Sequence, residues 1–333
     1  MRCASLLLFA ALPLAAQMPK FTDAHIQTAA FSGDLAAQLR TAAQQPGPRW
    51  WGYAVPGIPG HRDGCGVAYL DSGNVVEGGE EQNAPEVSRP LVVLYELQQS
   101  QVAKIRIFDL ACEIEAQGAS VTWLSGVSPD ASVKLLAGLV EADKSTAHGA
   151  LGALAETDGS SAEAALERFA GSAYPDAVRN QALFWLGSTR GHAGFLAVQK
   201  AAQSSQASDE VRKRATFALS VSRDPGASDE LIRMAKLDPA ASVREQALFW
   251  LAQKATKKAI GAISDAIAND PATAVKERAV FGLTQIPNGD GVPLLIQVAQ
   301  TNANPAVRKK AMFWLGQSKD PRAVAFFAQI LEH

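Results

Sequence analysis

Histidine and cysteine are scarce in this chain, which has five histidines and three cysteines among 333 residues. No two histidines have the spacing that places two metal ligands on one face of a helix; they are His25, His61, His148, His192 and His333. The sequence also lacks HExxH, GxSxG, CxxC and the glycine-rich phosphate-binding loop. These absences exclude the enzyme classes that carry those motifs. We therefore expect no catalytic residue, no metal and no cofactor, and a binding protein rather than an enzyme.

The chain has no apolar run of the roughly 20 residues that a membrane-spanning helix needs. Its first residues instead have the layout of a secretory signal peptide. Arg2 precedes an apolar stretch over 6–12, and small residues stand at Ala15 and Ala16. We predict a signal peptide over 1–16 and export to the periplasm or the extracellular space, without stable insertion in a membrane. Cys3 is not expected to carry a lipid, because no apolar segment precedes it.

Removal of that segment leaves two cysteines, Cys65 and Cys112. In an oxidising compartment, an even pair in a small domain is most simply a disulfide. A metal pair is the alternative, with His61 and Asp63 as the nearest further ligands, and two free thiols are the other. The sequence favours the disulfide.

Charge is balanced overall but uneven along the chain. Residues 1–171 hold 11 Lys and Arg against 19 Asp and Glu, whereas residues 172–333 hold 20 against 14. A mildly basic second half is ordinary solvated surface. In an exported protein it does not indicate nucleic acid, so we expect no nucleic-acid partner.

The amino-terminal region has a mixed pattern. Residues 17–48 read as a lead-in with one amphipathic helix at about 32–44, and β-branched or aromatic runs at 91–97, 102–108 and 121–124 predict strands. Residues 50–66, rich in glycine and proline, read as a loop with short extended pieces. That loop contains Trp50-Trp51-Gly52-Tyr53 and His61-Arg62-Asp63, for which a structural role is favoured over a small catalytic site. We therefore predict a small β-rich module over 49–127.

A helix start follows at residue 128. Ser128 is suited to cap the helix, Pro129 to occupy its first position and Asp130 to sit in its first turn. From there to the end of the chain the pattern is helical, with short breaks of Gly, Asp and Pro. The sequence predicts a domain boundary near residue 127.

A short phrase recurs five times at intervals of 32 or 33 residues. It reads VRNQALFWLG at 178–187, VRKRATFALS at 211–220, VREQALFWLA at 243–252, VKERAVFGLT at 275–284 and VRKKAMFWLG at 307–316. Such a period is typical of stacked helical units. If the first valine is position zero, Val, Ala and Leu recur at zero, plus four and plus eight. Because a helix turns about 100° per residue, these three positions share one buried stripe.

An amphipathic helix follows each phrase, at about 195–202, 231–237, 260–268, 292–299 and 324–331. A degenerate earlier copy is visible at Thr146, Ala150 and Leu154. One such helix cannot bury its apolar face alone, so the units are expected to stack.

This arrangement resembles the HEAT repeat, in which pairs of antiparallel helices form a curved solenoid. In that family an aspartate in the turn within a repeat precedes a basic residue of the second helix by six positions. Asp238 with Arg244 and Asp270 with Lys276 match that spacing, and Asn302 with Arg308 is a near match. Ala173 before Arg179 and Gln206 before Arg212 do not, so the ladder is expected to weaken there. The resemblance covers about 128–332 and implies about six helix pairs and a closing helix, within an α+β, mainly α, protein.

Position plus six of every phrase is phenylalanine: Phe184, Phe217, Phe249, Phe281 and Phe313. It points about 160° from the buried stripe. It shares that face with plus two, which is Asn180, Lys213, Glu245, Glu277 and Lys309. If these helices line the concave side, as the resemblance implies, the phenylalanines form a ladder on an interaction surface. They could equally pack between neighbouring helices. Trp185, Trp250 and Trp314 at plus seven alternate with Ala218 and Gly282, which favours packing.

The sequence thus favours a non-catalytic scaffold of the cell envelope that binds a protein or peptide on the concave face, with Lys213, Glu245, Glu277 and Lys309 at the rim. In the alternative, the amino-terminal module is a ligand-binding or catalytic head and the solenoid a spacer or oligomerisation element. The HEAT-like iron hydroxylases use repeated His-Glu pairs, which do not occur here. The last helix carries Val324, Phe326 and Phe327, so self-association through it is a further expectation.

Overall fold

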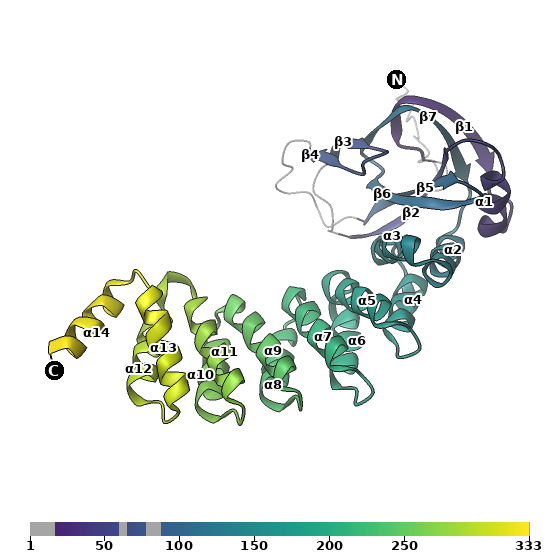
Figure 1. Ribbon diagram of the computed structural model, residues 1–333. Helices are drawn as coiled ribbons and strands as arrows, with labels where there is room; N and C mark the ends of the chain where they lie inside the picture. The colour runs from purple at the N-terminus through teal and green to yellow at the C-terminus, as the bar shows by residue number, and fades with distance from the viewer. Residues whose placement is uncertain (1–16, 60–64, 78–87, 333) are drawn as a thin grey trace, which may run out of the picture. The chain divides into compact units, whose positions relative to one another are not determined.

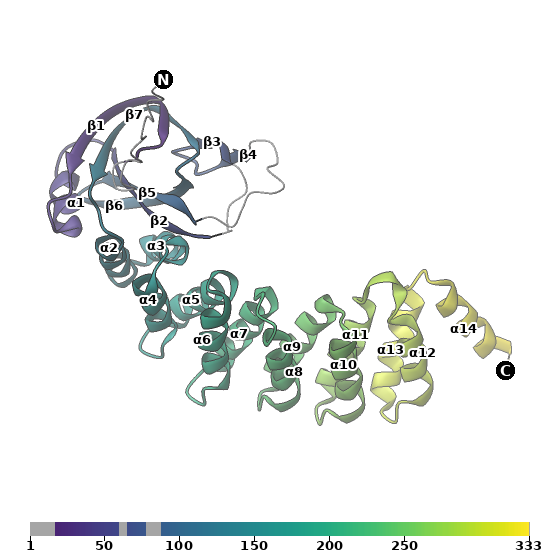
Figure 2. The same cartoon turned by 180° about the vertical axis from the view of Figure 1, so that it is seen from behind.

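The structure, a computed structural model, describes residues 17–59, 65–77 and 88–332 (Figure 1). The predicted signal peptide, His61, Asp63 and His333 lie outside these residues. The chain forms two compact units, Met1–Arg168 and Phe169–His333. The first contains the strands and the second contains helices alone, as Figures 1 and 2 show. The protein is therefore α+β and mainly α, as expected.

The first unit is built on a seven-stranded mixed sheet of order β4-β3-β7-β2-β5-β6, with β1 on the other edge of β7. The strands are β1 (Lys20–Ala30), β2 (Arg49–Pro59), β3 (Cys65–Tyr69), β4 (Val75–Glu77), β5 (Ser88–Gln98), β6 (Gln101–Asp109) and β7 (Glu113–Ser125). β7 is the organising strand, because it pairs in parallel with β1, β2 and β3. β5 pairs antiparallel with β2 and β6.

The strands predicted from β-branched runs are confirmed as β5, β6 and β7. The loop prediction for the glycine- and proline-rich segment is wrong over residues 50–59, which lie in strand β2. Its prolines are tolerated because Pro56 lies opposite Pro90 and the register shifts between Pro56 and Pro59, beyond the continuous ladder. The side chains of Trp50, Tyr53 and Val55 are buried. Burial therefore overrides the local loop signal of this segment.

The predicted lead-in helix is confirmed as α1 (Leu35–Ala43), whose cap is Asp34. The strand β1 before it was missed by the sequence reasoning. Only Phe21, Ala24 and their neighbours meet the core, and most of β1 is exposed. Its sequence therefore shows no apolar alternation.

Two helices predicted to start the solenoid pack within the first unit. They are α2 (Pro129–Ala142) and α3 (Lys144–Glu156). The Tyr53 hydroxyl on the sheet lies 2.8 Å from the Ser132 hydroxyl of α2 and 2.6 Å from that of Tyr95. At the end of α3, the Asp158 N–H donates to the Pro56 carbonyl at 2.9 Å. The unit therefore extends beyond residue 127 to Arg168, within α4 (Ser160–Ala170).

The cap of α2 confirms its prediction in detail. The Ser128 hydroxyl accepts the Ala131 N–H at 3.2 Å, and Pro129 occupies the first turn. This helix start could be predicted from the local sequence alone, because the residues that end the preceding strand also begin the helix.

The two cysteines belong to neighbouring strand ends. Cys65 opens β3, whose Val67 pairs with Glu113 of β7, and Cys112 directly precedes Glu113. Cys112 is buried. The Cys65 side chain lies outside those described, so the disulfide stays a prediction that this backbone register favours.

The second unit is a stack of antiparallel helices. They are α5 (Asp176–Thr189), α6 (Gly191–Gln203), α7 (Asp209–Val221), α8 (Ala227–Leu237), α9 (Ala241–Lys254), α10 (Lys257–Asn269), α11 (Thr273–Thr284), α12 (Val292–Thr301), α13 (Pro305–Gln317) and α14 (Pro321–Glu332), with the 3-10 turn η2 (Pro287–Gly289) before α12. The five phrases form α5, α7, α9, α11 and α13, hereafter the phrase helices. Each is followed by the predicted amphipathic helix.

The stripe of Val, Ala and Leu is the core of this stack. Its members in α7, α9, α11 and α13 are at most 1 % exposed, and only Val178 of α5 remains partly exposed. The small residues let the helices approach closely: a Cβ on Gly187 would lie 2.6 Å from the Ala218 carbonyl oxygen. A larger residue at Gly187 would push α5 and α7 apart.

The arginine–aspartate ladder is present but staggered by one repeat. The Arg212 guanidinium donates to both oxygens of Asp238 at 2.9 and 3.2 Å, and Arg244 donates to Asp270 at 2.8 and 3.0 Å. Each arginine thus bonds the aspartate of the next repeat, and Arg244 Nη1 also donates to the carbonyl of Asp238 in its own turn.

The expected weakening of the ladder at Arg212 is therefore wrong, because Arg212 needs no aspartate at Gln206. Lys276 reaches only the carbonyl of Ala268, and Arg308 the carbonyls of Asn302 and Ala303. The buried charge pairs are concentrated at α7 to α10.

Candidate functional site

The phrase helices carry a continuous row of rings across the second unit. Phe184 stacks on Phe217 with centroids 5.5 Å apart and planes 10° apart. Phe217 lies 5.0 Å from Trp250, which lies 4.9 Å from Phe249. Ring contacts therefore join α5 to α7 and α7 to α9, so the expected phenylalanines are connected along these helices rather than separate.

The row continues through a cation. The guanidinium of Arg278 lies 5.2 Å from the ring centroids of both Phe249 and Phe281. Beyond it, Trp314 lies 5.0 Å from Phe281 and 5.0 Å from Phe313. We call the five phenylalanines with Trp185, Trp250, Trp314 and Arg278 the aromatic ladder.

The alternation at plus seven has a geometric reason. Trp250 and Trp314 each bridge to the phenylalanine of the preceding phrase helix. Where Ala218 and Gly282 stand instead, the bridge is made by Phe184 on Phe217 and by Arg278. The tryptophans therefore pack, as favoured from the sequence, but their contacts are within the ladder.

The ladder is neither fully buried nor fully exposed. Phe184, Phe217, Phe249 and Phe281 are partly buried, and Phe313 is 53 % exposed. Both interpretations left open by the sequence thus hold in part, because each ring packs against a neighbour with one part and meets solvent with another. The buried indole N–H groups of Trp185, Trp250 and Trp314 have no hydrogen-bond partner among the described residues, but those of Trp51 and Trp123 have none either. This feature does not distinguish the ladder.

The predicted rim residues flank the ladder unevenly. Lys213 forms an ion pair with Glu210 at 2.9 Å, Glu245 and Glu277 are partly buried, and Lys309 is exposed. Along the stack these four positions are positive, negative, negative and positive, so they do not form a patch of one sign.

Sequence reasoning missed a second polar row, at plus three. It contains Arg214, Arg278 and Lys310, and Lys310 Nζ lies 5.9 Å from the Phe313 centroid. Residues three apart on a helix are neighbours. The spacing from plus three to the phenylalanine at plus six could therefore have revealed these cations. Arg278 and Lys310 therefore place positive charge beside the rings of α9, α11 and α13.

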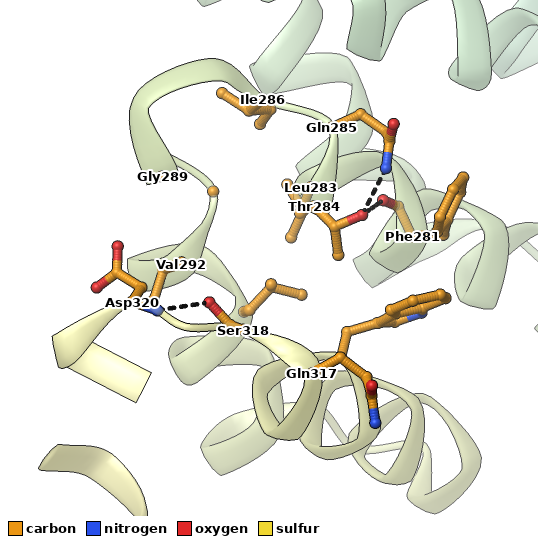
Figure 3. A pocket seen from close by; sticks show the side chains of 13 residues that line it. Phe281, Leu283, Thr284, Gln285, Ile286, Gly289, Val292, Gln317, Ser318 and Asp320 are labelled. Atoms are coloured by element: carbon orange, nitrogen blue, oxygen red, sulfur yellow. Dashed lines mark hydrogen bonds between the residues drawn. The ribbon is translucent and has the colours of Figure 1, made fainter. Parts of the chain in front are cut away.

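A cavity of about 320 Å³ lies at one end of the ladder (Figure 3). Phe281 and Trp314 form one wall, and the turn from Ile286 to Gly291 forms another. The Thr284 hydroxyl in it accepts the Gln285 amide N–H at 2.9 Å and donates to the Phe281 carbonyl at 2.7 Å.

Asp320 provides the negative charge of this cavity. Its carboxylate pairs with Arg322 at 2.6 Å. The hydrogen bonds from Arg322 lower the pKa of Asp320 to about 2, so the group stays ionised at neutral pH. Because the Asp320 carboxylate and the Thr284 hydroxyl already form hydrogen bonds within the chain, the apolar rings are the part of this lining that suits an apolar side chain.

The described residues contain no group of three or more metal-ligating side chains. Within the same ranges, no helix is long and apolar enough to cross a membrane.

Residues 260–333 match the family model of HEAT repeats. No curated protein matches the sequence. Human deoxyhypusine hydroxylase, solved with glycerol, is similar at 17 % identity over 60 % of this chain and 90 % of that one, with a TM-score of 0.32.

Two further solved structures are similar to this chain. The CpcE–CpcF complex of phycocyanin lyase from Nostoc sp. is 18 % identical over 57 % of this chain and 77 % of that one, with a TM-score of 0.34. Kap95p, solved with RanGDP, is 19 % identical over 57 % of this chain and 30 % of its own length, with a TM-score of 0.37. The HEAT-repeat match over residues 260–333, together with the stacked helix pairs of the second unit, identifies the carboxy-terminal part of this chain as a HEAT-repeat solenoid.

Proposed function

We propose that the protein is a non-catalytic scaffold that binds another protein or a peptide along the aromatic ladder. The observation that carries this proposal is the continuity of the ladder, with its row of partly exposed rings from α5 to α13. Contiguous exposed apolar surface is typical of interaction sites, and solenoids present such surfaces along one row of helices.

The placement of the ladder supports binding on the concave face. The phrase helices contact one another more extensively than α6, α8, α10 and α12 do. Closer spacing is expected of the inner row of a curved solenoid. An extended partner bound along that row would contact one phenylalanine of the ladder in each repeat.

The chemistry of the ladder defines the class of partner. Its rings suit apolar or aromatic side chains, and Arg278 and Lys310 beside the rings suit carboxylates. We therefore propose a peptide segment with apolar residues spaced between acidic ones. The cavity at Trp314 would hold the side chain at one end of that segment.

The test is affinity capture from an envelope extract with the chain as bait, followed by a binding measurement with the captured partner. Replacing Phe217, Phe249 and Phe281 together with Ser would remove helix contacts as well as binding surface. The sharper variant is Phe313→Ser with Arg278→Gln, since Phe313 is the most exposed ring.

The matched control is Leu237→Ser on α8, where an apolar side chain is 70 % exposed on a helix of the other row. The proposal expects the ladder variant to lose at least about tenfold in affinity, equivalent to about 1.4 kcal/mol, while the control binds like wild type. Equal binding by all three proteins would contradict it.

Export and self-association remain further parts of the proposal. Export rests on residues 1–16 of the sequence and on the register that favours a Cys65–Cys112 disulfide. For self-association, α14 exposes Val324, Ile330 and Leu331, whereas Phe326 is buried within the stack. A molar mass that rises with concentration, and falls again for Val324→Ser, would support self-association.

A further inference from the structure

The first unit contains an apolar cavity of about 440 Å³. It is bounded by α1, by the turn between β5 and β6, and by α2, and it opens to solvent. Its larger apolar lining residues are Leu39, Leu97, Val102, Leu135 and Leu139, with Ala36, Ala43 and Ala142 beside them. The volume lies within the roughly 300–1,000 Å³ typical of small-molecule sites, which are mostly apolar with few polar groups. This cavity therefore has the size and the lining of a ligand site.

The charged groups that line the cavity are both positive. They are Arg40 of α1 and Lys134 of α2, and both are exposed. Neither forms an ion pair within the described part of the chain, and no carboxylate is among the described residues that line the cavity. The carboxylate of Asp34, which caps α1 by accepting the Ala37 N–H at 3.0 Å, interacts electrostatically with both cations without forming an ion pair with either. Two cations at the rim of an apolar cavity favour a ligand with one anionic end.

We propose that this cavity binds a single-chain anionic amphiphile of the fatty-acid type. Its hydrocarbon chain lies among the leucines, and its carboxylate lies between Arg40 and Lys134. Removal of the chain from water supplies affinity that grows with each methylene, and charge-assisted hydrogen bonds from the two cations fix its orientation. This inference is independent of the ladder and concerns the other unit.

Gly138 provides a way to close the cavity without disturbing the fold. It lies on the cavity lining within α2, and a Cβ built on it meets no atom within 4 Å. The side chain of Gly138→Leu therefore begins in open space at the cavity lining. Leucine also has a higher helix propensity than glycine, so α2 is not weakened.

The experiment is calorimetric titration of the whole chain with octanoate, decanoate and dodecanoate below their micelle concentrations. We expect one site, an affinity that rises roughly fourfold per methylene until the cavity is filled, and loss of binding in Gly138→Leu. Arg40→Gln with Lys134→Gln should weaken dodecanoate by about tenfold or more. The control is Lys144→Gln, an exposed lysine of the same unit that does not line the cavity.

Several results would overturn the proposal. One is dodecanoate binding that Gly138→Leu leaves intact, and another is the absence of saturable binding by wild type. Dodecyltrimethylammonium or dodecanol binding as tightly as dodecanoate would show that the cations do not select the ligand. If the protein sediments with anionic phospholipid vesicles but does not bind free dodecanoate, its ligand is a membrane surface rather than a free amphiphile.

Discussion

The two units of this protein differ in how far apart in sequence their contacting residues lie. In the solenoid, Arg212 pairs with Asp238 and Phe184 stacks on Phe217, so partners come from the same or the next repeat. In the first unit, β1 pairs with β7 from Lys20↔Glu113 to Ala30↔Ser125. A solenoid is stabilised by neighbouring repeats, whereas the sheet depends on pairings that close long loops. A destabilising substitution in the solenoid should therefore affect only neighbouring repeats, whereas one in the first unit should affect the whole unit.

The largest expected effect is that of Leu94→Ala. Leu94 is fully buried in β5, which pairs with both β2 and β6. Loss of the side chain should cost about 3 to 4 kcal/mol of unfolding free energy, from lost burial and the cavity left behind. Hydrogen exchange should accelerate in every strand of the first unit. The matched variant Leu251→Ala in α9 should accelerate hydrogen exchange in α7 to α11. The acceleration should decrease in helices further along the stack. An equally uniform response in both units would remove the distinction.

Asp270→Asn should be slightly less damaging. It leaves the Arg244 guanidinium, which is 8 % exposed, without its carboxylate, and uncompensated buried charge is strongly destabilising. We expect a loss of about 3 kcal/mol in chemical denaturation of the second unit. Asp229→Asn removes the exposed pair with Lys258 and should change stability by no more than about 0.5 kcal/mol. Similar losses in the two variants would contradict the importance of the staggered ladder.

A high-pH experiment tests the junction between α2 and the sheet. Burial raises the pKa of Tyr53 from 10.0 to about 12. Above pH 10 the unfolded chain therefore loses this proton while the folded chain keeps it, and stability should fall as pH rises from about 10 to 12. The slope from this group is at most about 1.4 kcal/mol per pH unit. Tyr53→Phe should reduce the slope without removing it, because burial also raises the pKa of the neighbouring Tyr95. The substitution should cost about 1 kcal/mol at neutral pH, from the lost hydrogen bonds. An unchanged slope would show that Tyr53 is not the responsible group.

The smallest effect is expected at Arg278→Gln. Its guanidinium contacts two phenylalanine rings, and a partly exposed cation–π contact contributes about 0.5–1 kcal/mol. Thermal unfolding should therefore change little while partner binding falls. Lys257→Gln, at an exposed lysine of α10, should change neither property.

The same difference between local and distant contacts explains what the sequence could predict. Val243, Ala247 and Leu251 lie on one helix, so their spacing alone indicates the buried stripe. The phenylalanines at plus six align because every repeat is nearly identical. The pairing of Arg212 with Asp238 joins two successive repeats. It could not be predicted from residue spacing within one repeat, because that spacing does not show how far apart two repeats lie.

The first unit was less predictable for a physical reason. Strand β2 carries Pro56 and Pro59 and reads as a loop, and only its pairing with β5 and β7 makes it a strand. The apolar cavity brings together residues near 40, 100 and 135, which share no local pattern.

The most direct test of the ladder as a binding surface is a hydrogen-exchange footprint of the chain with and without its captured partner. The proposal predicts slower exchange in α5, α7, α9, α11 and α13, with α6, α8, α10 and α12 unchanged. Protection confined to those other helices or to the strands of the first unit would contradict it.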